Sequence, residues 1–276
     1  MSLVITSTAN PKVKDIVQLL TKSRERKSRG VCIVEGSRDI NRALACGWEP
    51  VELWQLDGSE VLLNRMAFPR FYLASPKVFG KIAYRNTTEC VVAVFKVPEI
   101  GLNAQRYILE EAKCVLVLEG IEKPGNLGAA LRTACAAGVD AVVLADAPLD
   151  PFSPNVIRNA TGALFEMAII SATTEQIIPA LKALGMSINV TYLNDNATSM
   201  FDVQWSQKCA IVLGEEAGGL TELWIAEADQ NIIIPMSGGA IDSLNLSVSA
   251  AILMFHWKSQ HSVLAKNKMV RGAGHS

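Results

Sequence analysis

The sequence predicts an α/β fold with two domains, because runs of Val, Ile and Leu alternate with segments of helical pattern along most of the chain. Continuous apolar runs are typical of strands that are buried on both faces of a parallel sheet. The alternation breaks at 98–112, which we interpret as a linker, with a helix over 107–112 as the alternative for its second half. We therefore expect a smaller α/β domain over 1–97 and a parallel-sheet domain over 113–258. Residues 259–276 are basic and are expected to form a flexible tail.

The elements of the first domain follow from local signals. Asn10 and Pro11 are typical of a helix start and predict a helix over 13–21. Apolar runs predict the remaining strands, with helical segments between them. The strands are expected at 31–36, 51–56, 71–74 and 90–97, and the helices at 37–46 and 75–84.

The second domain repeats this alternation over a longer stretch. Its strands are expected at 113–120, 140–146, 167–172, 187–193, 209–214 and 231–236. Its helices are expected at 126–137, 154–163, 174–184 and 244–258. Six continuous apolar strands alternating with helices predict a parallel sheet that is covered on both faces.

Composition excludes several classes of protein. The chain has 276 residues, of which 50% are hydrophobic, so disorder of the whole chain is excluded. No apolar run approaches about 18 residues and the N-terminal segment lacks the order of a signal peptide, so we expect neither a membrane span nor secretion. Six scattered cysteines without a C-x-x-C pair predict reduced thiols in the cytoplasm and no metal site. His256, His261 and His275 all lie late, which disfavours hydrolases with a Ser-His or Cys-His pair.

Charge is unevenly distributed along the chain. The net charge is −1, but 1–30 carry +5 and 258–276 carry +4, which leaves −10 for 31–257. A basic segment on an acidic body indicates contact with a polyanion. A solvated helix face explains the same pattern, and charge alone does not separate the two interpretations.

Three expected strands end in residues of unusual chemistry, and ligands of open parallel sheets bind beyond such ends. The first, over 119–138, has glycines around Asn126 and then Arg132 on a helix that is otherwise almost wholly apolar. We interpret Arg132 as facing the buried side, where it needs a partner or a functional role. A nucleotide-binding loop of the Rossmann type is an alternative, although G-x-G-x-x-G is absent.

The other two strand ends are also rich in glycine. At 212–224, glycines bracket Glu215 and Glu216. At 232–257, a strand is followed by a flexible loop and by Ser243 and Asn245, with Ser243 expected to cap the last helix.

Together, these motifs resemble the SpoU (TrmH) branch of the SPOUT RNA methyltransferases. The resemblance covers about 113–257 and rests on N-x-G-x3-R, G-x-E-x2-G-L and I-P-M…S-L-N-x-S-V. These motifs comprise Asn126, Gly128, Arg132, Gly214, Glu216, Gly219, Leu220, Ile234, Pro235, Met236, Ser243, Leu244, Asn245, Ser247 and Val248. The first 97 residues look like an auxiliary RNA-binding domain similar to ribosomal protein L30. The chain departs from many relatives at Lys123, where they have Asp, and at Glu166 to Ala168, where they have His and Pro.

The resemblance implies transfer of a methyl group from S-adenosylmethionine to a ribose 2′-hydroxyl of RNA. It also implies a deep trefoil knot, a homodimer and no metal, and we expect ribosomal RNA as the substrate in preference to tRNA. The implied catalytic residues are Arg132, Asn126, Glu216, Ser243 and Asn245. The implied cofactor-binding residues are Leu193, Gly214, Ile234, Met236, Ser243 and Leu244. The implied RNA-binding residues are Lys14, Lys22, Arg24, Arg26, Lys27 and Glu35.

Within this scheme Arg132 is an activator of the hydroxyl, because a guanidinium with a pKa of about 12 or more cannot act as a conventional base. Asn126 and Glu216 orient the loop or Arg132, and Ser243 and Asn245 hold the third loop. Two alternatives stay open at this point. One is an RNA-binding relative without catalysis, and the other is a Rossmann-like oxidoreductase.

Overall fold

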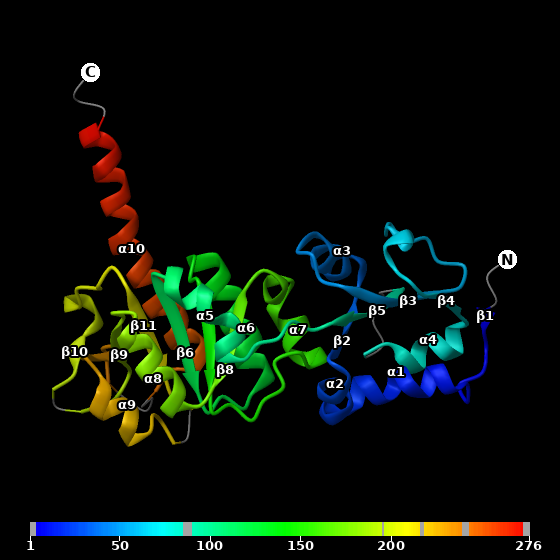
Figure 1. Cartoon of the computed structure of the whole chain (residues 1–276), viewed down its shortest axis with the longest axis horizontal. Helices are drawn as coiled ribbons and strands as arrows, with labels where there is room; N and C mark the ends of the chain where they lie inside the picture. The colour runs from blue at the N-terminus through cyan, green and yellow to red at the C-terminus, as the bar shows by residue number, and fades with distance from the viewer. Residues whose placement is uncertain (1–3, 85–89, 195, 216–217, 239–242, 273–276) are drawn as a thin grey trace. The chain divides into compact units, whose positions relative to one another are not determined.

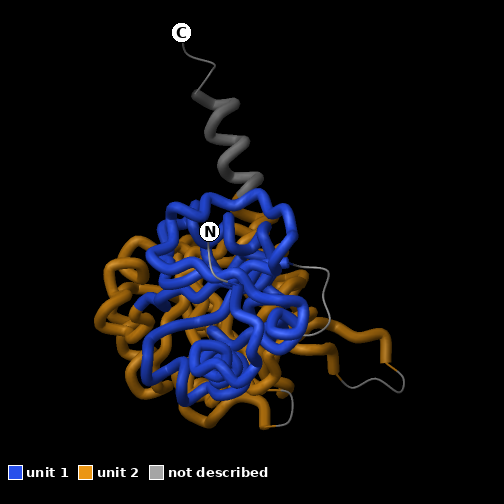
Figure 2. Tube along the Cα trace, turned by 90° about the vertical axis from the view of Figure 1, so that its right-hand side faces the viewer, with its two compact units in different colours: residues 1–98, 150–166 blue, residues 99–149, 167–276 orange. Residues whose placement is uncertain are grey.

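A computed structural model of the chain describes residues 4–84, 90–194, 196–215, 218–238 and 243–272. Its contacts divide the chain into two compact units, which Figure 2 colours separately. The first unit comprises 1–98 together with 150–166, and the second comprises 99–149 together with 167–276. The segment 150–166 was expected within the parallel-sheet domain, so its grouping with the first unit differs from the prediction.

The first unit is built on a mixed sheet of five strands in the order β1-β4-β3-β5-β2. Strands β1, β4 and β3 are parallel, and β5 runs antiparallel to both β3 and β2. The strands are β1 (Val4–Ile5), β2 (Val31–Glu35), β3 (Pro50–Leu56), β4 (Phe71–Ala74) and β5 (Val91–Lys96). Four of them confirm the predicted strands, whereas the short β1 was missed.

The helices of the first unit cover this sheet (Figure 1). They are α1 (Pro11–Thr21), α2 (Ser23–Arg29), α3 (Ser37–Ala45), α4 (Pro76–Ile82) and α7 (Pro154–Ala160), with short 3-10 turns η1 (Arg65–Ala67) and η2 (Ala163–Phe165). The Asn10 side chain accepts a hydrogen bond of 2.9 Å from the Lys12 N–H, which confirms the predicted start of α1. Apolar residues of α1 and α4 pack on Trp54 of β3 in one buried cluster.

Aromatic and charged contacts fasten 150–166 to the rest of the first unit. The Trp48 ring meets Phe152 and Phe165 edge to face, with ring centroids 5.8 and 5.0 Å apart. The Trp48 indole N–H also donates to the Phe165 carbonyl at 3.2 Å. Glu166 forms an ion pair with Arg42. These long-range contacts explain why α7 groups with a sheet that lies far away in the sequence.

The second unit contains an all-parallel sheet of seven strands in the order β10-β12-β9-β11-β6-β7-β8, which confirms the predicted parallel α/β architecture. The strands are β6 (Cys114–Glu119), β7 (Ala141–Ala145), β8 (Ala168–Ala172), β9 (Ser187–Val190), β10 (Thr198–Ser199), β11 (Cys209–Leu213) and β12 (Gln230–Ile233). The apolar cores of β6, β7 and β11 are wholly buried, as their continuous apolar sequences predict.

Helices pack on both faces of this sheet (Figure 1). They are α5 (Leu102–Glu111), α6 (Pro124–Ala137), α8 (Thr174–Ala183), α9 (Glu222–Glu227) and α10 (Leu246–Gly272), and η3 (Met200–Asp202) is a short 3-10 turn. Buried residues of α5, α8 and α9 share one apolar cluster with the strands, whereas α6 and α10 pack against each other.

Two helices extend beyond their predicted bounds. The expected linker contains α5, because Leu109 of this helix is fully buried in the core of the second unit. The last helix, α10, continues to Gly272, past its predicted end at 258. In the described part of the chain, no helix combines the length and apolar character that a bilayer crossing requires.

Candidate active site

Four neighbouring strands bring the predicted motifs to one edge of the second unit. Strands β12, β9, β11 and β6 are adjacent and parallel, so their carboxyl ends lie on the same side of the sheet. The three predicted strand-end motifs follow β6, β11 and β12. The sheet order therefore explains how residues more than 100 positions apart converge.

A pair of asparagines joins the first and third motifs. The Asn245 Nδ2 group donates to Asn126 Oδ1 at 3.0 Å. Asn245 Oδ1 also accepts from the Ser247 N–H at 3.0 Å and from the Ser247 hydroxyl at 2.7 Å. Asn245 immediately precedes α10 and caps its start, so the expected cap at Ser243 is wrong. One side chain thus starts α10 and ties it to the beginning of α6.

Arg132 is exposed on α6 and forms no hydrogen bond or ion pair with any residue that the structure describes. The expectation that it faces the buried side is wrong. The buried stripe of α6 is made by Leu127, Ala130, Leu131 and Ala134, and Arg132 lies outside this stripe. Most apolar residues of α6 are Ala or Gly, which expose little apolar surface to water. The apolar composition of α6 therefore does not require every side of the helix to be buried. A solvated guanidinium remains free to meet a phosphate or a hydroxyl.

The loop after β11 folds back so closely that it requires glycine. A Cβ atom at Gly214 would lie 2.1 Å from the Gly219 carbonyl oxygen, a distance that no side chain tolerates. Gly219 has a φ of +69°, and Glu215 Oε1 accepts from the Gly218 N–H at 3.1 Å. Glu216, the predicted catalytic acid of this loop, lies outside the described residues.

Glu119 is a functional candidate that the sequence analysis missed. This carboxylate is buried at the end of β6 and accepts from the Thr221 N–H and hydroxyl, both at 2.8 Å. It also accepts from the Thr174 hydroxyl at 2.9 Å, which in turn accepts from the Trp224 indole at 3.2 Å. Glu119 therefore holds the loop after β11 against β6. The sequence feature that could have identified Glu119 is its position directly after the apolar run CVLVL.

A cavity of about 460 Å³ opens among the loops that follow β9, β11 and β12. All six residues predicted to bind the cofactor line it: Leu193, Gly214, Ile234, Met236, Ser243 and Leu244. Its volume lies in the range of about 300–1,000 Å³ that is typical of small-molecule sites. Most of its lining side chains are apolar, so polar recognition there falls mainly to backbone groups. Leu193, one of the lining residues, is 76% exposed.

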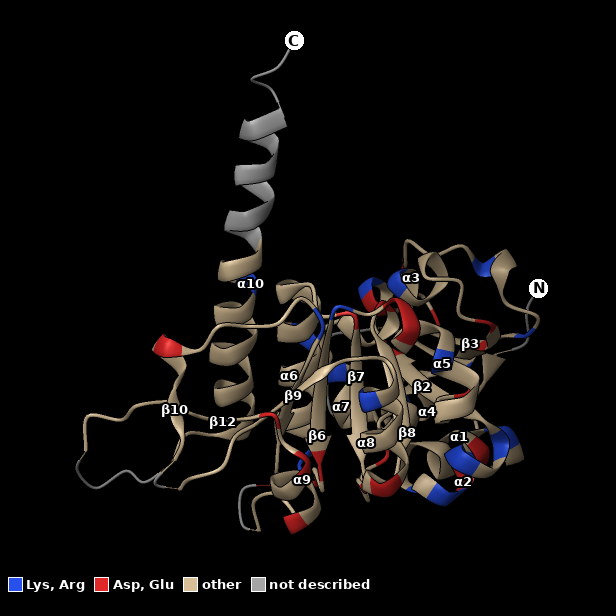
Figure 3. Cartoon of the chain, turned by 60° about the vertical axis from the view of Figure 1, so that its left-hand side comes forward, with Lys and Arg blue, Asp and Glu red and all other residues tan. Residues whose placement is uncertain are grey.

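The residues predicted to bind RNA lie in the first unit. Lys14, Lys22, Arg24 and Lys27 are exposed on or beside α1 and α2, where Figure 3 shows several stretches of ribbon in the blue of Lys and Arg. Glu35 is partly buried, and its Oε2 atom accepts from the Tyr84 N–H at 3.2 Å.

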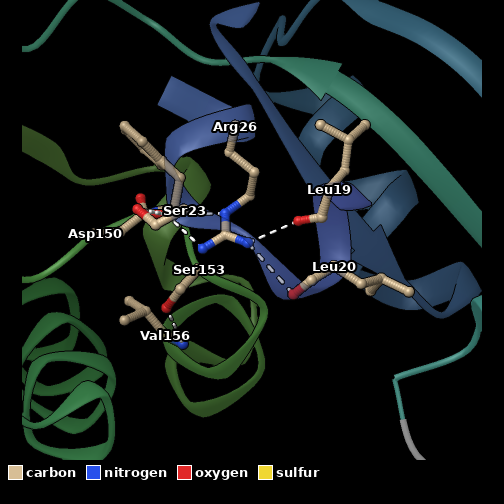
Figure 4. A network of polar contacts seen from close by, with 8 residues as sticks. Leu19, Leu20, Ser23, Arg26, Asp150, Ser153 and Val156 are labelled. Carbon is tan, nitrogen blue, oxygen red and sulfur yellow. Dashed lines mark hydrogen bonds and ion pairs between the residues drawn. The ribbon is translucent and has the colours of Figure 1, made fainter. Parts of the chain in front are cut away.

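Arg26 differs from its basic neighbours because it is buried, with 5% of its surface exposed. Its Nε and Nη2 groups donate to Asp150 Oδ2 at 2.8 and 2.6 Å, and Nη1 donates to the Leu19 carbonyl at 2.7 Å (Figure 4). The Ser23 hydroxyl adds a bond of 3.1 Å to the same Asp150 oxygen. Every nitrogen of this guanidinium is engaged, so Arg26 is a structural residue and not the predicted RNA contact.

Two family models match the chain. The SpoU rRNA methylase family matches residues 113–255, and an MRM3-like substrate-binding domain matches residues 10–93. The 23S rRNA (guanosine(2553)-2′-O)-methyltransferase RlmP of Bacillus subtilis is 31% identical over 252 residues, which are 91% of this chain and 98% of that protein.

Solved structures agree with these matches. An rRNA methyltransferase from Sinorhizobium meliloti with bound AdoMet is 28% identical, with a TM-score of 0.83 over 94% of this chain and 98% of that one. The crystal structure of an RNA 2′-O ribose methyltransferase is 33% identical, with a TM-score of 0.77 over 94% of this chain and 99% of that one.

Proposed function

The chain belongs to the SpoU rRNA methylase family, and we propose that it transfers a methyl group from S-adenosylmethionine to a ribose 2′-hydroxyl of ribosomal RNA. One observation carries the proposal: a cavity of suitable size lies at the carboxyl edge of the parallel sheet, lined by the family's own loops. Ribosomal RNA is favoured over tRNA because the Bacillus subtilis relative is named for 23S rRNA. The cytoplasmic location we propose agrees with six cysteines that form no disulfide.

The residues present fit S-adenosylmethionine. Gly214 lets the chain turn back on Gly219, which keeps this wall of the cavity free of side-chain atoms. Leu193, Ile234, Met236 and Leu244 give apolar surface for a ring, and the backbone of the three loops gives donors and acceptors. When bound, the cofactor supplies a methyl group on a positively charged sulfur.

Arg132 activates the attacking hydroxyl in this proposal. Its guanidinium stabilises the negative charge that develops on the 2′-oxygen, and donors aimed at such charge lower a barrier strongly. The Asn126–Asn245 bond fixes the start of the helix that carries Arg132 relative to α10. Glu119 holds the neighbouring loop. Ser243 lines the cavity, and Glu216 keeps its proposed role of orienting the loop or Arg132.

We also propose that a second copy of the chain completes the site. Leu193 lines the cavity and is 76% exposed, and Arg132 has no hydrogen-bond or ion-pair partner among the described residues. On α10, Val248 and Phe255 are about half exposed, at 46% and 47%, and so offer apolar surface to a homodimer interface. A homodimer would bring RNA and cofactor sites of two chains together, as the family resemblance implies.

The proposed trefoil knot is supported by the path of the last 40 residues. Strand β12 lies on the far side of β9 from β6, yet the helix that follows it packs on α6 and is bonded to Asn126. Helix α10 also packs on β11, which lies two places from β12 in the sheet.

The first unit is proposed as the RNA-binding domain, with the second unit as the methyltransferase. Their charges differ in sign: the first unit carries 16 Lys and Arg against 11 Asp and Glu, and the second carries 10 against 16. The excess of positive charge on the first unit attracts the RNA backbone. The second unit has an excess of negative charge, so we assign binding of the RNA backbone to the first unit.

Calorimetric titration of the purified protein with S-adenosylmethionine tests the cofactor, with NADH as the control ligand. We expect micromolar binding of S-adenosylmethionine alone. Binding of NADH alone would refute the proposal and favour an oxidoreductase, and binding of neither ligand would favour an inactive RNA-binding relative.

Arg132→Ala tests the activator. The variant should lose at least about 100-fold in methyl transfer to unmodified ribosomal RNA, because removal of one group that stabilises an oxyanion costs about 10²–10³ in rate. Its binding of S-adenosylmethionine should stay within about twofold of the parent. Arg106→Ala, which removes an exposed arginine from α5, is the matched control and should keep full activity. An Arg132→Ala variant with parental activity would remove Arg132 from the mechanism.

A further inference from the structure

The first unit contains a second cavity, of about 160 Å³, that is separate from the proposed cofactor site. Strand β2 and helix α3 form one part of its wall, and α7 forms another with Pro154, Ile157 and Arg158. These three residues lie outside 10–93, the range matched by the substrate-binding family model. The cavity is therefore assembled from two parts of the sequence that have separate family assignments.

The wall contributed by α7 is firmly held. Before the helix, Asp150 is bound by the buried Arg26, and Ser153 caps the helix by accepting from the Val156 N–H at 3.4 Å (Figure 4). After the helix, Phe165 packs against Trp48. A helix fastened at both ends presents Arg158 from a defined position.

The lining combines an apolar floor with a charged rim. Ile33, Pro154 and Ile157 are buried and form the apolar part. Arg158, which is exposed, and Arg38, whose side chain is 77% exposed and pairs with Asp39 at 3.2 Å, supply positive charge. Arg158 makes no hydrogen bond or ion pair within the described residues, so its guanidinium needs no rearrangement to meet a ligand.

The size and composition of this cavity indicate its ligand. It is smaller than the roughly 300 Å³ at which whole small-molecule sites begin, so it suits one ring system. The carboxylates of Glu35 and Asp39 in its wall disfavour a phosphate inside, whereas the apolar floor suits the face of a base. Arginines at a rim suit the phosphates on either side. Unpaired RNA bases are commonly held in this way, on apolar or guanidinium surfaces.

We propose that this cavity receives one unpaired base of the RNA, with Arg38 and Arg158 at the flanking phosphates. The inference rests on the proposed function, because RNA is the substrate there. It assigns to the first unit a preference for RNA with an unpaired nucleotide, in addition to its general attraction for the backbone.

Fluorescence anisotropy with the full chain tests the inference. The probes are a labelled single-stranded RNA of 12 nucleotides with mixed sequence and the same strand annealed to its complement. We expect tighter binding of the single strand. Arg158→Ala and Arg38→Ala should each weaken that binding by about five- to tenfold and change duplex binding by less than twofold.

Arg65→Ala is the matched control, because it removes an exposed arginine of the same unit that contacts Phe71 outside the cavity. It should weaken single-strand binding by less than twofold. The inference is overturned if the cavity variants lose no more than this control, or if they weaken duplex and single strand equally. Titration of each variant with S-adenosylmethionine separates the two proposals: intact cofactor binding with a failed RNA test refutes the base cavity alone.

Discussion

Gly214 gives the sharpest test of how the proposed cofactor site is built. In Gly214→Ala, the new methyl group would lie 2.1 Å from the Gly219 carbonyl oxygen, 2.2 Å from its carbonyl carbon and 2.5 Å from the Leu220 nitrogen. All three atoms are backbone, so no side-chain rotation relieves the clash and the loop after β11 must move. Overpacking of a rigid site costs about 1–3 kcal/mol, and contact with backbone on this scale places the expected cost near the upper end, about 3 kcal/mol.

The displaced loop also predicts a loss of cofactor binding. Gly214 and Gly219 both line the cavity of about 460 Å³, so the same movement changes its wall. We expect calorimetry to show at least tenfold weaker binding of S-adenosylmethionine, and urea denaturation to show the lower stability. Gly125→Ala is the matched control, since nothing lies within 4 Å of a Cβ atom there and the substitution favours the helix α6. If Gly214→Ala behaves like Gly125→Ala in both assays, the close approach of the loop is not what shapes the site.

Two further predictions concern α10. Asn245→Ala should lower the free energy of unfolding by about 1 kcal/mol, because the helix loses its cap. Asn245→Ser can still cap the helix and should lower the free energy of unfolding by less. Equal losses for the two variants in urea denaturation would contradict the capping role. The neutral His256 ring accepts a hydrogen bond of 2.9 Å from the Trp205 indole, and burial lowers the pKa of His256. The unfolded chain therefore binds a proton first as pH falls below about 6.5, so stability is fully present above that pH and declines below it, by at most about 1.4 kcal/mol per pH unit. His256→Gln does not titrate and should show a smaller loss between pH 7.5 and 5.5, and identical losses in the two proteins would exclude His256 as the source.

The sequence was most informative where structure is local. The strands β6 and β11 were predictable because their apolar runs are continuous, and burial on both faces of a parallel sheet requires such runs. The residues around the proposed cofactor site were predictable for a related reason. They follow three strand ends, and the geometry of a parallel sheet brings such ends together.

The remaining features depend on contacts that no local pattern contains. The basic residues of 22–29 look alike in the sequence, and only the distant Asp150 distinguishes the buried Arg26 from its exposed neighbours. The grouping of α7 with the first unit depends in the same way on Trp48, about 100 positions earlier. Arg132 was misjudged because a helix of small residues looks buried on every side.

Residues 150–166 pack with the first unit although their neighbours in sequence belong to the second unit. This arrangement limits where segments of the chain can be exchanged with those of a related protein. The backbone passes from one unit to the other three times, after residues 98, 149 and 166. A single recombination point at residue 98 would join residues 1–98 of a foreign protein to the native residues 99–276, which include α7. The foreign segment would then need equivalents of Trp48 and Arg26 to contact the native 150–166. Chimaeras that exchange 150–166 together with 1–98 keep these partners in register.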